Sequence, residues 1–382
     1  MYKHTHACMP VACLYSMVRQ CGAALDHVMS VQGCCHRWTY WGAYKDGRWW
    51  CSHCHCHALH YRRCKHCLQW RCDTCVRLRR KPTRYREALL SVAERPSCSV
   101  LDVRNHSVAW DANAASWVND AHKLFLKDGF VIIHNVLEPN ERHTVLQDCE
   151  HAAEQIVGFE RRGNRGPGRY SFGSGSSTGS MLHVQSFSTY LLNNGCLRLQ
   201  PALNMIFAPG CFICTGGGGD FVVGGTKTDQ ELHSDMIIKS KDDVWLPPPM
   251  ISVNFVIQAL TSLNGPLRII PGTQLWRGEV PDPIDEDWLH SCLCPVPAGS
   301  AIIRDVRVLH SGTRNLTDQI RFLPSIEFVS TGFRETERRD CFPPNRTLPN
   351  DMHERLHPDI MKLCSEIVIP KGREVYQSYI MK

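Results

Sequence analysis

The sequence predicts an α+β protein with a double-sheet β core, preceded by a separate cysteine-rich module. Three observations indicate this organisation. Thirteen of the 21 cysteines lie in the first 98 residues, helix-like patterns follow between residues 111 and 159, and strand-like runs separated by turns fill the rest. We therefore expect a Cys/His-rich module with a basic linker at residues 1–98 and a globular domain at residues 99–382.

Two amphipathic helices open the globular domain. The stretch "DANAASWVNDAHKLFLKDG" predicts a helix that ends near Gly129, and "EPNERHTVLQDCEHAAEQIVGF" predicts a second with Pro139 in its first turn. "FVIIHNVL" between them is predicted to be a strand. The stretch "RRGNRGPGRYSFGSGSSTGS" is rich in Gly, Ser and Arg, and we expect it to be a mobile loop.

The later part of the chain reads as strands and turns. Strands are predicted at "DFVVGGT", "MISVNFVIQAL", "LRIIPGT", "SAIIRDVRVLH" and "IRFLPSIEFV". Asn264-Gly265 predicts a tight turn. "CTGGGGD" and "GGTKT" do not fit the spacing of a phosphate-binding loop, so they are interpreted as flexible turns.

Composition limits the class of protein. A chain of 382 residues with 43% hydrophobic residues can build a sizeable core, and it has no apolar run long enough for a membrane-spanning helix. The net charge of +6 is too small to indicate a nucleic-acid partner by itself. An odd cysteine count, CxxC pairs and a poor signal-peptide core favour thiols in a reducing compartment, so we expect a cytoplasmic protein.

A candidate metal site centres on "QELHSDM". In an extended segment His233 and Asp235 point to the same side, so both can bind one ion. A non-haem Fe(II) site needs a second histidine, and His310 ends a strongly β-forming run. The His-x-Asp pattern is common by chance, as His357-x-Asp359 shows. That second pair lies in a helical or turn-like stretch and is interpreted as a surface feature.

Arg321 is the candidate anion-binding residue. "LHSGTRNLTDQIRF" predicts a hairpin that returns Arg321 to the rung beside His310. An arginine there can bind the distal carboxylate of a chelating dicarboxylate such as 2-oxoglutarate. Arg314 competes for this role, but it lies in the turn and is expected to be exposed. Asp305 and Arg307 are expected to form a structural ion pair.

Residues 124–329 resemble the phytanoyl-CoA dioxygenase family of Fe(II)/2-oxoglutarate-dependent oxygenases. The matching blocks are "KDGFVIIHNVLEPNE", "QELHSD", "NGPLRIIPGTQLW" and "IRDVRVLHSGTRNLTDQIRF". The resemblance implies a double-stranded β-helix (jelly-roll, cupin-like) with flanking helices. It implies iron on His233, Asp235 and His310, and 2-oxoglutarate on Arg321. The co-substrate's neighbours would be Asn254, Gln230 and Thr313.

The cysteine-rich module predicts structural zinc. Two CxxC pairs with a short spacer suit tetrahedral thiolate binding, and a third pair could hold a second ion with Cys34, Cys35, His36 or Cys56. The alternative is a disordered leader with reactive thiols. The six cysteines of the three pairs are Cys51, Cys54, Cys64, Cys67, Cys72 and Cys75.

Three functions are open at this point. The leading expectation is an oxygenase that uses 2-oxoglutarate and O₂ to hydroxylate a small-molecule or lipid-like substrate, with release of succinate and CO₂. In the first alternative the zinc module directs the oxygenase to a protein or a nucleic acid. In the second, the chain is a non-catalytic, zinc-dependent binding protein.

Overall fold

The structure is a computed structural model that describes residues 38–41, 61–64, 70–72, 101–159, 163, 165–174, 176, 178–236, 247–275, 291–333 and 346–369. The chain divides into two compact units, Met1–Arg84 and Tyr85–Lys382. The boundary expected at residue 98 lies outside the described residues. Among those described, no helix combines the length and the apolar character that crossing a membrane requires.

In the first unit the structure describes a small antiparallel sheet in the order β1–β2–β3. Its strands are Trp38–Trp41, Tyr61–Cys64 and Trp70–Cys72. Two of the six cysteines predicted to bind zinc, Cys64 and Cys72, end β2 and β3. Cys51, Cys54, Cys67 and Cys75 lie outside the described residues.

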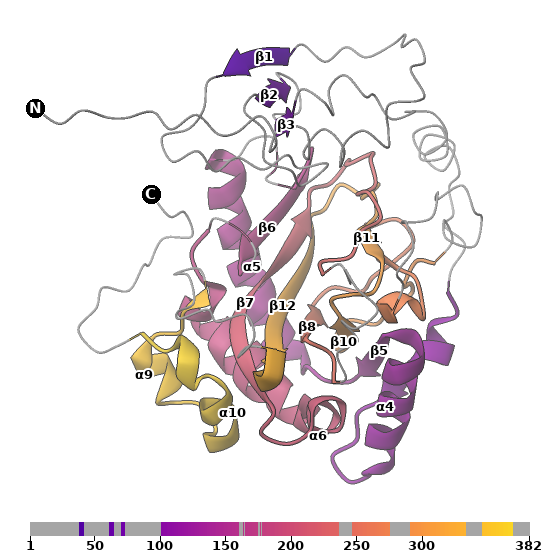
Figure 1. Cartoon of the computed structure of the whole chain (residues 1–382), viewed down its shortest axis with the longest axis vertical. Coiled ribbons are helices and arrows are strands. Elements are labelled where there is room, and N and C mark those ends of the chain that lie inside the picture. The colour runs from indigo at the N-terminus through magenta and orange to yellow at the C-terminus, as the bar shows by residue number, and fades with distance from the viewer. Residues whose placement is uncertain are drawn as a thin grey trace, which may run out of the picture. The chain divides into compact units, whose positions relative to one another are not determined.

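The second unit is built on a seven-stranded mixed sheet in the order β4–β5–β10–β8–β12–β7–β6, much of it visible in Figure 1. Only the β4–β5 pair is parallel. The strands are β4 (Ser107–Ala109), β5 (Phe130–His134), β6 (Arg169–Gly173), β7 (Phe212–Val222), β8 (Met250–Val256), β10 (Ser300–Asp305) and β12 (Arg321–Ser330).

A second, smaller sheet faces this large sheet. It pairs β9 (Leu267–Ile269) with β11 (His310–Gly312), and single bridges join His233 to β11 and Cys292 to β9. Buried side chains fill the space between the two sheets, among them Ile132 and Ile302 from the large one. The predicted double-sheet core is therefore present, with a jelly-roll-like arrangement.

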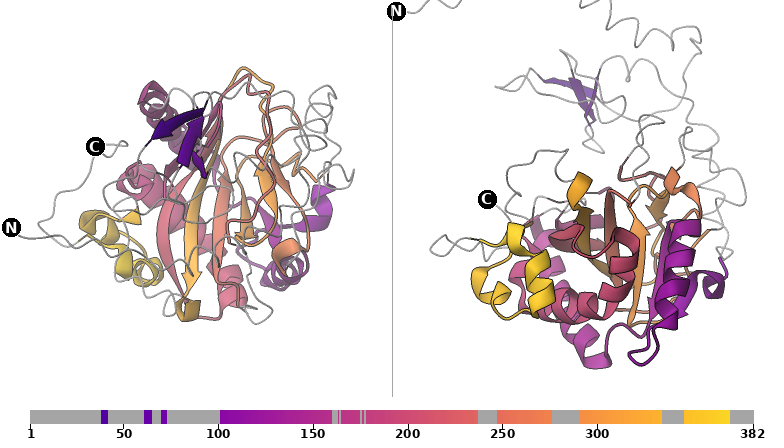
Figure 2. Two further views of the ribbon diagram at one scale, coloured as in Figure 1. Left: turned by 45° about the horizontal axis from the view of Figure 1, so that its top comes forward. Right: turned by 60° about the horizontal axis from the view of Figure 1, so that its bottom comes forward.

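Helices cover the other face of the large sheet (Figure 2). The apolar residues of its strands alternate toward them, as Phe322, Ile326 and Phe328 do on β12. The helices are α4 (Ser116–Asp128), α5 (Pro139–Phe159), the π-helix η3 (Phe187–Gly195), α6 (Cys196–Phe207), α9 (Asn350–His353) and α10 (Pro358–Leu363). Short 3-10 turns lie at Val103–His106, Met181–His183, Thr273–Leu275 and Ser365–Ile367.

The two predicted helices are confirmed. Gly129 ends α4 with a left-handed φ of 78°, and its N–H bonds the carbonyl of Phe125. Pro139 begins α5, where a missing N–H costs no helix hydrogen bond. The helix over Phe187–Phe207 was not predicted, because it contains the turn-like stretch "NNG" and an internal proline, Pro201.

Three local predictions are wrong. The expected loop contains β6, because Arg169–Gly173 pairs with β7. "CTGGGGD" lies inside β7 and is no turn. His310 and Arg321 do not share a hairpin: β11 pairs with β9, whereas β12 pairs with β7 and β8. The two residues therefore lie on opposite sheets, because long-range pairing overrides the short connection.

Candidate metal centre

Backbone pairing brings the two halves of the candidate metal site together. The N–H groups of His233 and His310 each donate to the other residue's carbonyl, at 3.0 and 2.8 Å, and the Asp235 N–H donates to the carbonyl of Val306 at 3.0 Å. These bonds hold the His-x-Asp segment alongside β11. A pattern that is common by chance thus meets a histidine 75 residues away.

The three side chains converge on one point. The ligand atoms of His233, Asp235 and His310 all lie within 4.8 Å of one another. The Nε2 atom of His233 lies 3.7 Å from one oxygen of Asp235, and that of His310 lies 3.6 Å from the other. Each Nδ1 is within hydrogen-bond distance of a backbone carbonyl, so both Nε2 atoms are left for an ion.

The protonation states suit metal binding. Burial lowers the pKa of His310 to about 3, and the neighbouring Arg304 guanidinium acts in the same direction. Burial alone would raise the pKa of Asp235, but His310, Arg304 and His233 together hold it well below its usual range. Near neutral pH the site therefore offers a neutral imidazole and a carboxylate, the forms that bind metal. Two histidines and one carboxylate are the donor set of a facial Fe(II) site.

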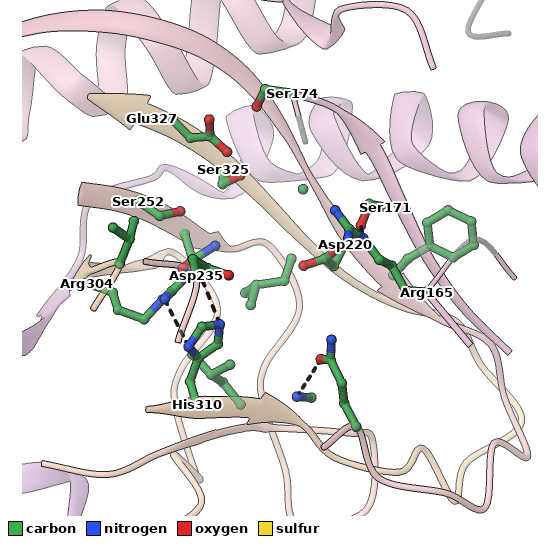
Figure 3. A pocket seen from close by; sticks show the side chains of 18 of the residues that line it. Arg165, Ser171, Ser174, Asp220, Asp235, Ser252, Arg304, His310, Ser325 and Glu327 are labelled. Carbon is green, nitrogen blue, oxygen red and sulfur yellow. Dashed lines mark hydrogen bonds and ion pairs between the residues drawn. The ribbon is translucent and has the colours of Figure 1, made fainter. Parts of the chain in front are cut away.

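Arg304 is a residue that the sequence reasoning missed. It lies at the end of β10, and its Nη2 donates to Asp235 Oδ2 at 2.9 Å. Its Nη1 lies 3.1 Å from His310 Nδ1 (Figure 3). The available signal was a lone arginine in the apolar run "SAIIRDV", since a buried charge requires a partner.

A cavity of about 370 Å³ opens beside the ligands and is lined from both sheets. Arg321 lines it and is only 3% exposed, and its Nε and Nη1 have no hydrogen-bond partner among the described residues. Burial lowers the pKa of Arg321 to about 10, and Arg169 adds to this effect, yet the side chain stays charged at neutral pH. A buried cation with unpaired donors fits an anionic ligand such as a carboxylate.

Of the three residues expected beside the co-substrate, two line the cavity and one does not. Asn254 lines the cavity, and its Oδ1 has no hydrogen-bond partner in the part of the chain that the structure describes. Gln230 also lines it, and its Oε1 accepts from the Gly312 N–H at 3.1 Å. The Thr313 hydroxyl instead donates to the carbonyl of Pro266 at 2.6 Å, and the residue does not line the cavity.

Arg169 is the second residue missed, because its segment was expected to be a loop. It lines the cavity near Arg321, and its Nη2 donates to the carbonyls of Thr228 and Thr313 at 2.8 and 2.6 Å. These bonds connect β6 to the segment that precedes His233 and to the segment that follows β11. Arg169 therefore supports the wall of the cavity as well as adding positive charge to it.

The other charged residues considered from the sequence do not line the cavity. Arg314 is buried, not exposed as expected, but it does not line the cavity. The Asp305–Arg307 ion pair is confirmed at 2.6 Å, with both side chains buried.

The second His-x-Asp pair is a surface feature, as expected. His357 caps α10 by accepting a hydrogen bond from the Asp359 N–H at 3.3 Å, and both side chains are about half exposed. The pair therefore has a structural role at a helix start.

Comparison with known proteins finds similarity to oxygenases. Residues 222–323 match the family model described as "Phytanoyl-CoA dioxygenase (PhyH)". The chain is 26% identical over 261 residues to "Dioxygenase andF" of Emericella variicolor, covering 64% of this chain and 84% of that protein. It is 22% identical over 231 residues to "Dioxygenase sphC" of Aspergillus fumigatus, covering 55% of this chain and 58% of that protein.

Solved structures also match at low identity. AviO1 from Streptomyces viridochromogenes is 19% identical with a TM-score of 0.40, over 57% of this chain and 97% of that one. HygX from Streptomyces hygroscopicus, solved with nickel, 2-oxoglutarate and hygromycin B bound, is 14% identical with a TM-score of 0.42. That match covers 56% of this chain and 87% of HygX.

Proposed function

This chain belongs to the phytanoyl-CoA dioxygenase family of Fe(II)/2-oxoglutarate-dependent oxygenases and is a dioxygenase, and from this premise we propose which residues perform its reaction. The proposed reaction is hydroxylation of a small-molecule substrate with release of succinate and CO₂. One observation carries this proposal: a His-Asp-His cluster and a buried arginine with unpaired donors line the same cavity.

The proposed roles follow from the geometry. His233 and His310 would hold the iron through Nε2, and Asp235 would hold it through one carboxylate oxygen. Arg304 keeps the other oxygen of Asp235 engaged, which orients the carboxylate. Arg321 binds the distal carboxylate of 2-oxoglutarate with two parallel hydrogen bonds. Asn254 and Gln230 line the space between.

Iron, when bound with 2-oxoglutarate and O₂, supplies the oxidative decarboxylation and the oxidising power needed to hydroxylate a C–H bond. The chain's own contribution is placement. His233, Asp235 and His310 would hold the metal by three donors and would leave it able to bind the co-substrate and O₂. Residues from two sheets surround this space, so the reacting groups are held together and partly shielded from water.

The test is succinate release. The purified full chain with Fe(II), 2-oxoglutarate and O₂ should form succinate slowly without any added substrate, because such oxygenases turn over partly uncoupled. Asp235→Ala protein prepared in parallel should form none. Absence of succinate from the wild-type chain, with iron bound, would overturn the proposal.

The alternatives are weaker. Membership of a dioxygenase family argues against a non-catalytic binding protein. Direction to a protein or nucleic acid depends on residues 1–98, and nothing in the described part of the chain favours it. We retain structural zinc on the three CxxC pairs as a proposal, supported by their spacing alone.

A further inference from the structure

The cavity has two ends of different chemistry (Figure 3). We call one the arginine end; it holds Arg165, Ser171 and Asp220. Arg169 and Arg321 belong to it as well, since both are register partners of Val222, two residues after Asp220 on β7. We call the other the hydroxyl end; it holds Ser174, Ser252, Ser325 and Glu327. Asp235 and Arg304 lie close to the hydroxyl end, and Ser252 is the register partner of Arg304 across β8 and β10.

Strand register places the hydroxyl end. Ser252 on β8 lies opposite Glu327 on β12, and Ser325 lies opposite Asn254. Directly opposite residues of an antiparallel pair point to the same face, so these four side chains form one polar patch over two strands. On the other side of β12, Ser325 lies opposite Gly218, which also bridges to Ser174.

Glycines border this patch on its other side, where the chain is closely packed. Gly216 and Gly218 on β7 lie opposite Glu327 and Ser325. A Cβ at Gly216 would lie 3.0 Å from the Cβ of Ser174 and 3.1 Å from Cγ of Arg346. Because Gly216 carries no side chain, Ser174 and Arg346 can therefore lie close to the patch.

Several polar atoms at this end lack partners within the described part of the chain. Ser174 Oγ and Asn254 Oδ1 are buried there without a hydrogen bond. Ser252 and Ser325 are each 5% exposed, and their hydroxyls make no hydrogen bond to any residue that the structure describes. Buried polar groups are nearly always paired in folded proteins, so a set of unpaired ones in a cavity indicates a ligand or ordered water that pairs them.

The charges at this end are balanced. Glu327 pairs with Arg346 at 2.8 Å, and both line the cavity. The pair offers acceptors and donors without a net charge. A neutral molecule with groups that both donate and accept fits such a site better than an ion does, and hydroxyl groups have this property.

Resting on the proposed function, we propose that the substrate presents several hydroxyl groups to the hydroxyl end, as a cyclic polyol or glycoside does. If 2-oxoglutarate extends from the metal ligands to Arg321, it occupies the arginine end and leaves the hydroxyl end for substrate. An acyl chain there would leave the hydroxyls of Ser174, Ser252 and Ser325 unpaired, which disfavours binding. The lipid-like substrate expected from the sequence is therefore the less suitable class.

The test uses binding to full chain loaded with Mn(II) and 2-oxoglutarate under nitrogen, so that no turnover occurs. The probes are myo-inositol and methyl glucosides, with dodecanoate as the apolar comparison, followed by calorimetry or ligand-observed NMR. We expect polyol binding without dodecanoate binding. The Ser252→Ala/Ser325→Ala double variant should weaken polyol binding roughly tenfold or more, because it removes two hydrogen-bonding groups.

The matched control is Ser330→Ala, also on β12, whose hydroxyl accepts from the Phe333 N–H and does not line the cavity. It should bind polyols as wild type does. Failure of every polyol to bind, tighter binding of dodecanoate, or an equal effect of Ser330→Ala would overturn the inference. Succinate release without substrate separates these outcomes from failure of the proposed function, since that release does not depend on the hydroxyl end.

Discussion

Arg321 is the residue on which co-substrate binding should depend most. It is fully buried, and its pKa of about 10 keeps it charged near neutral pH. Removing one partner of a buried charge pair costs about 3–5 kcal/mol, which corresponds to a loss of affinity on the order of 10²–10³-fold. Arg321→Ala should raise the 2-oxoglutarate requirement by about that factor and leave Mn(II) binding largely intact, as titration will show.

Two variants sharpen this prediction. Arg321→Lys should recover only part of the loss, because an ammonium group does not form two parallel bonds to a carboxylate. Arg355→Ala removes a surface arginine whose side chain is 68% exposed, so it should have no effect on 2-oxoglutarate. An unchanged 2-oxoglutarate requirement in Arg321→Ala would mean that another cation binds the distal carboxylate.

The three metal ligands should be individually indispensable. His233→Ala, Asp235→Ala and His310→Ala each remove one of the three clustered donors, so each should lose Mn(II) binding and turnover while keeping the fold. Electron paramagnetic resonance and circular dichroism measure the two properties. His357→Ala and Asp359→Ala are the matched controls, since that pair only caps α10. Loss of metal with the control pair instead would refute the site assignment.

Arg304 should position Asp235 without binding substrate. Loss of a group that orients a metal ligand typically costs roughly 10–100-fold in metal affinity or activity. Arg304→Gln should therefore reduce turnover by about this factor. Arg304→Lys should retain part of the turnover, because a lysine keeps the positive charge beside Asp235 but lacks a second nitrogen to contact His310. Comparing kcat, the KM for 2-oxoglutarate and Mn(II) affinity tests this. A Gln variant as active as wild type would show that Asp235 needs no such support.

Among the elements, β7 depends on its glycines. Gly218 lies where β6 approaches β7, and a Cβ there would lie 2.2 Å from the carbonyl oxygen of Phe172. Overpacking of this kind costs about 1–3 kcal/mol, so Gly218→Ala should lower the free energy of unfolding by about this amount. Gly158→Ala, in α5, meets no atom within 4 Å and should be neutral or stabilising. Denaturant unfolding measures the free energy of unfolding of both variants. Equal values for Gly218→Ala and Gly158→Ala would contradict the close approach of β6 to Gly218.

At the scale of the whole molecule, the two compact units should bind different metals. Structural zinc contributes about 10–16 kcal/mol to small zinc-dependent modules. Cys54→Ser and Cys67→Ser in the full chain should therefore reduce zinc content and leave succinate release intact. Cys211→Ser, at an exposed free cysteine of the second unit, is the control. Elemental analysis that finds no zinc in the wild-type chain would reject the module.

The sequence by itself determined the elements whose signals are local. The helix ending at Gly129 and the helix beginning at Pro139 follow from periodicity and end signals, which act within a few residues. The sequence also singled out His233, Asp235 and His310, whose side chains the structure brings together, while metal binding by them stays a prediction. The two helices could be predicted because their signals depend only on the local backbone.

Tertiary structure alone decided how the site is closed. The pairing of β11 with β9, and of β12 with β7 and β8, places His310 and Arg321 on facing sheets instead of adjacent rungs. It also brings Arg304 to Asp235 and turns an expected loop into β6. Such contacts join residues far apart in the chain, so their choice depends on which strand edges meet in the folded protein and not on any local pattern.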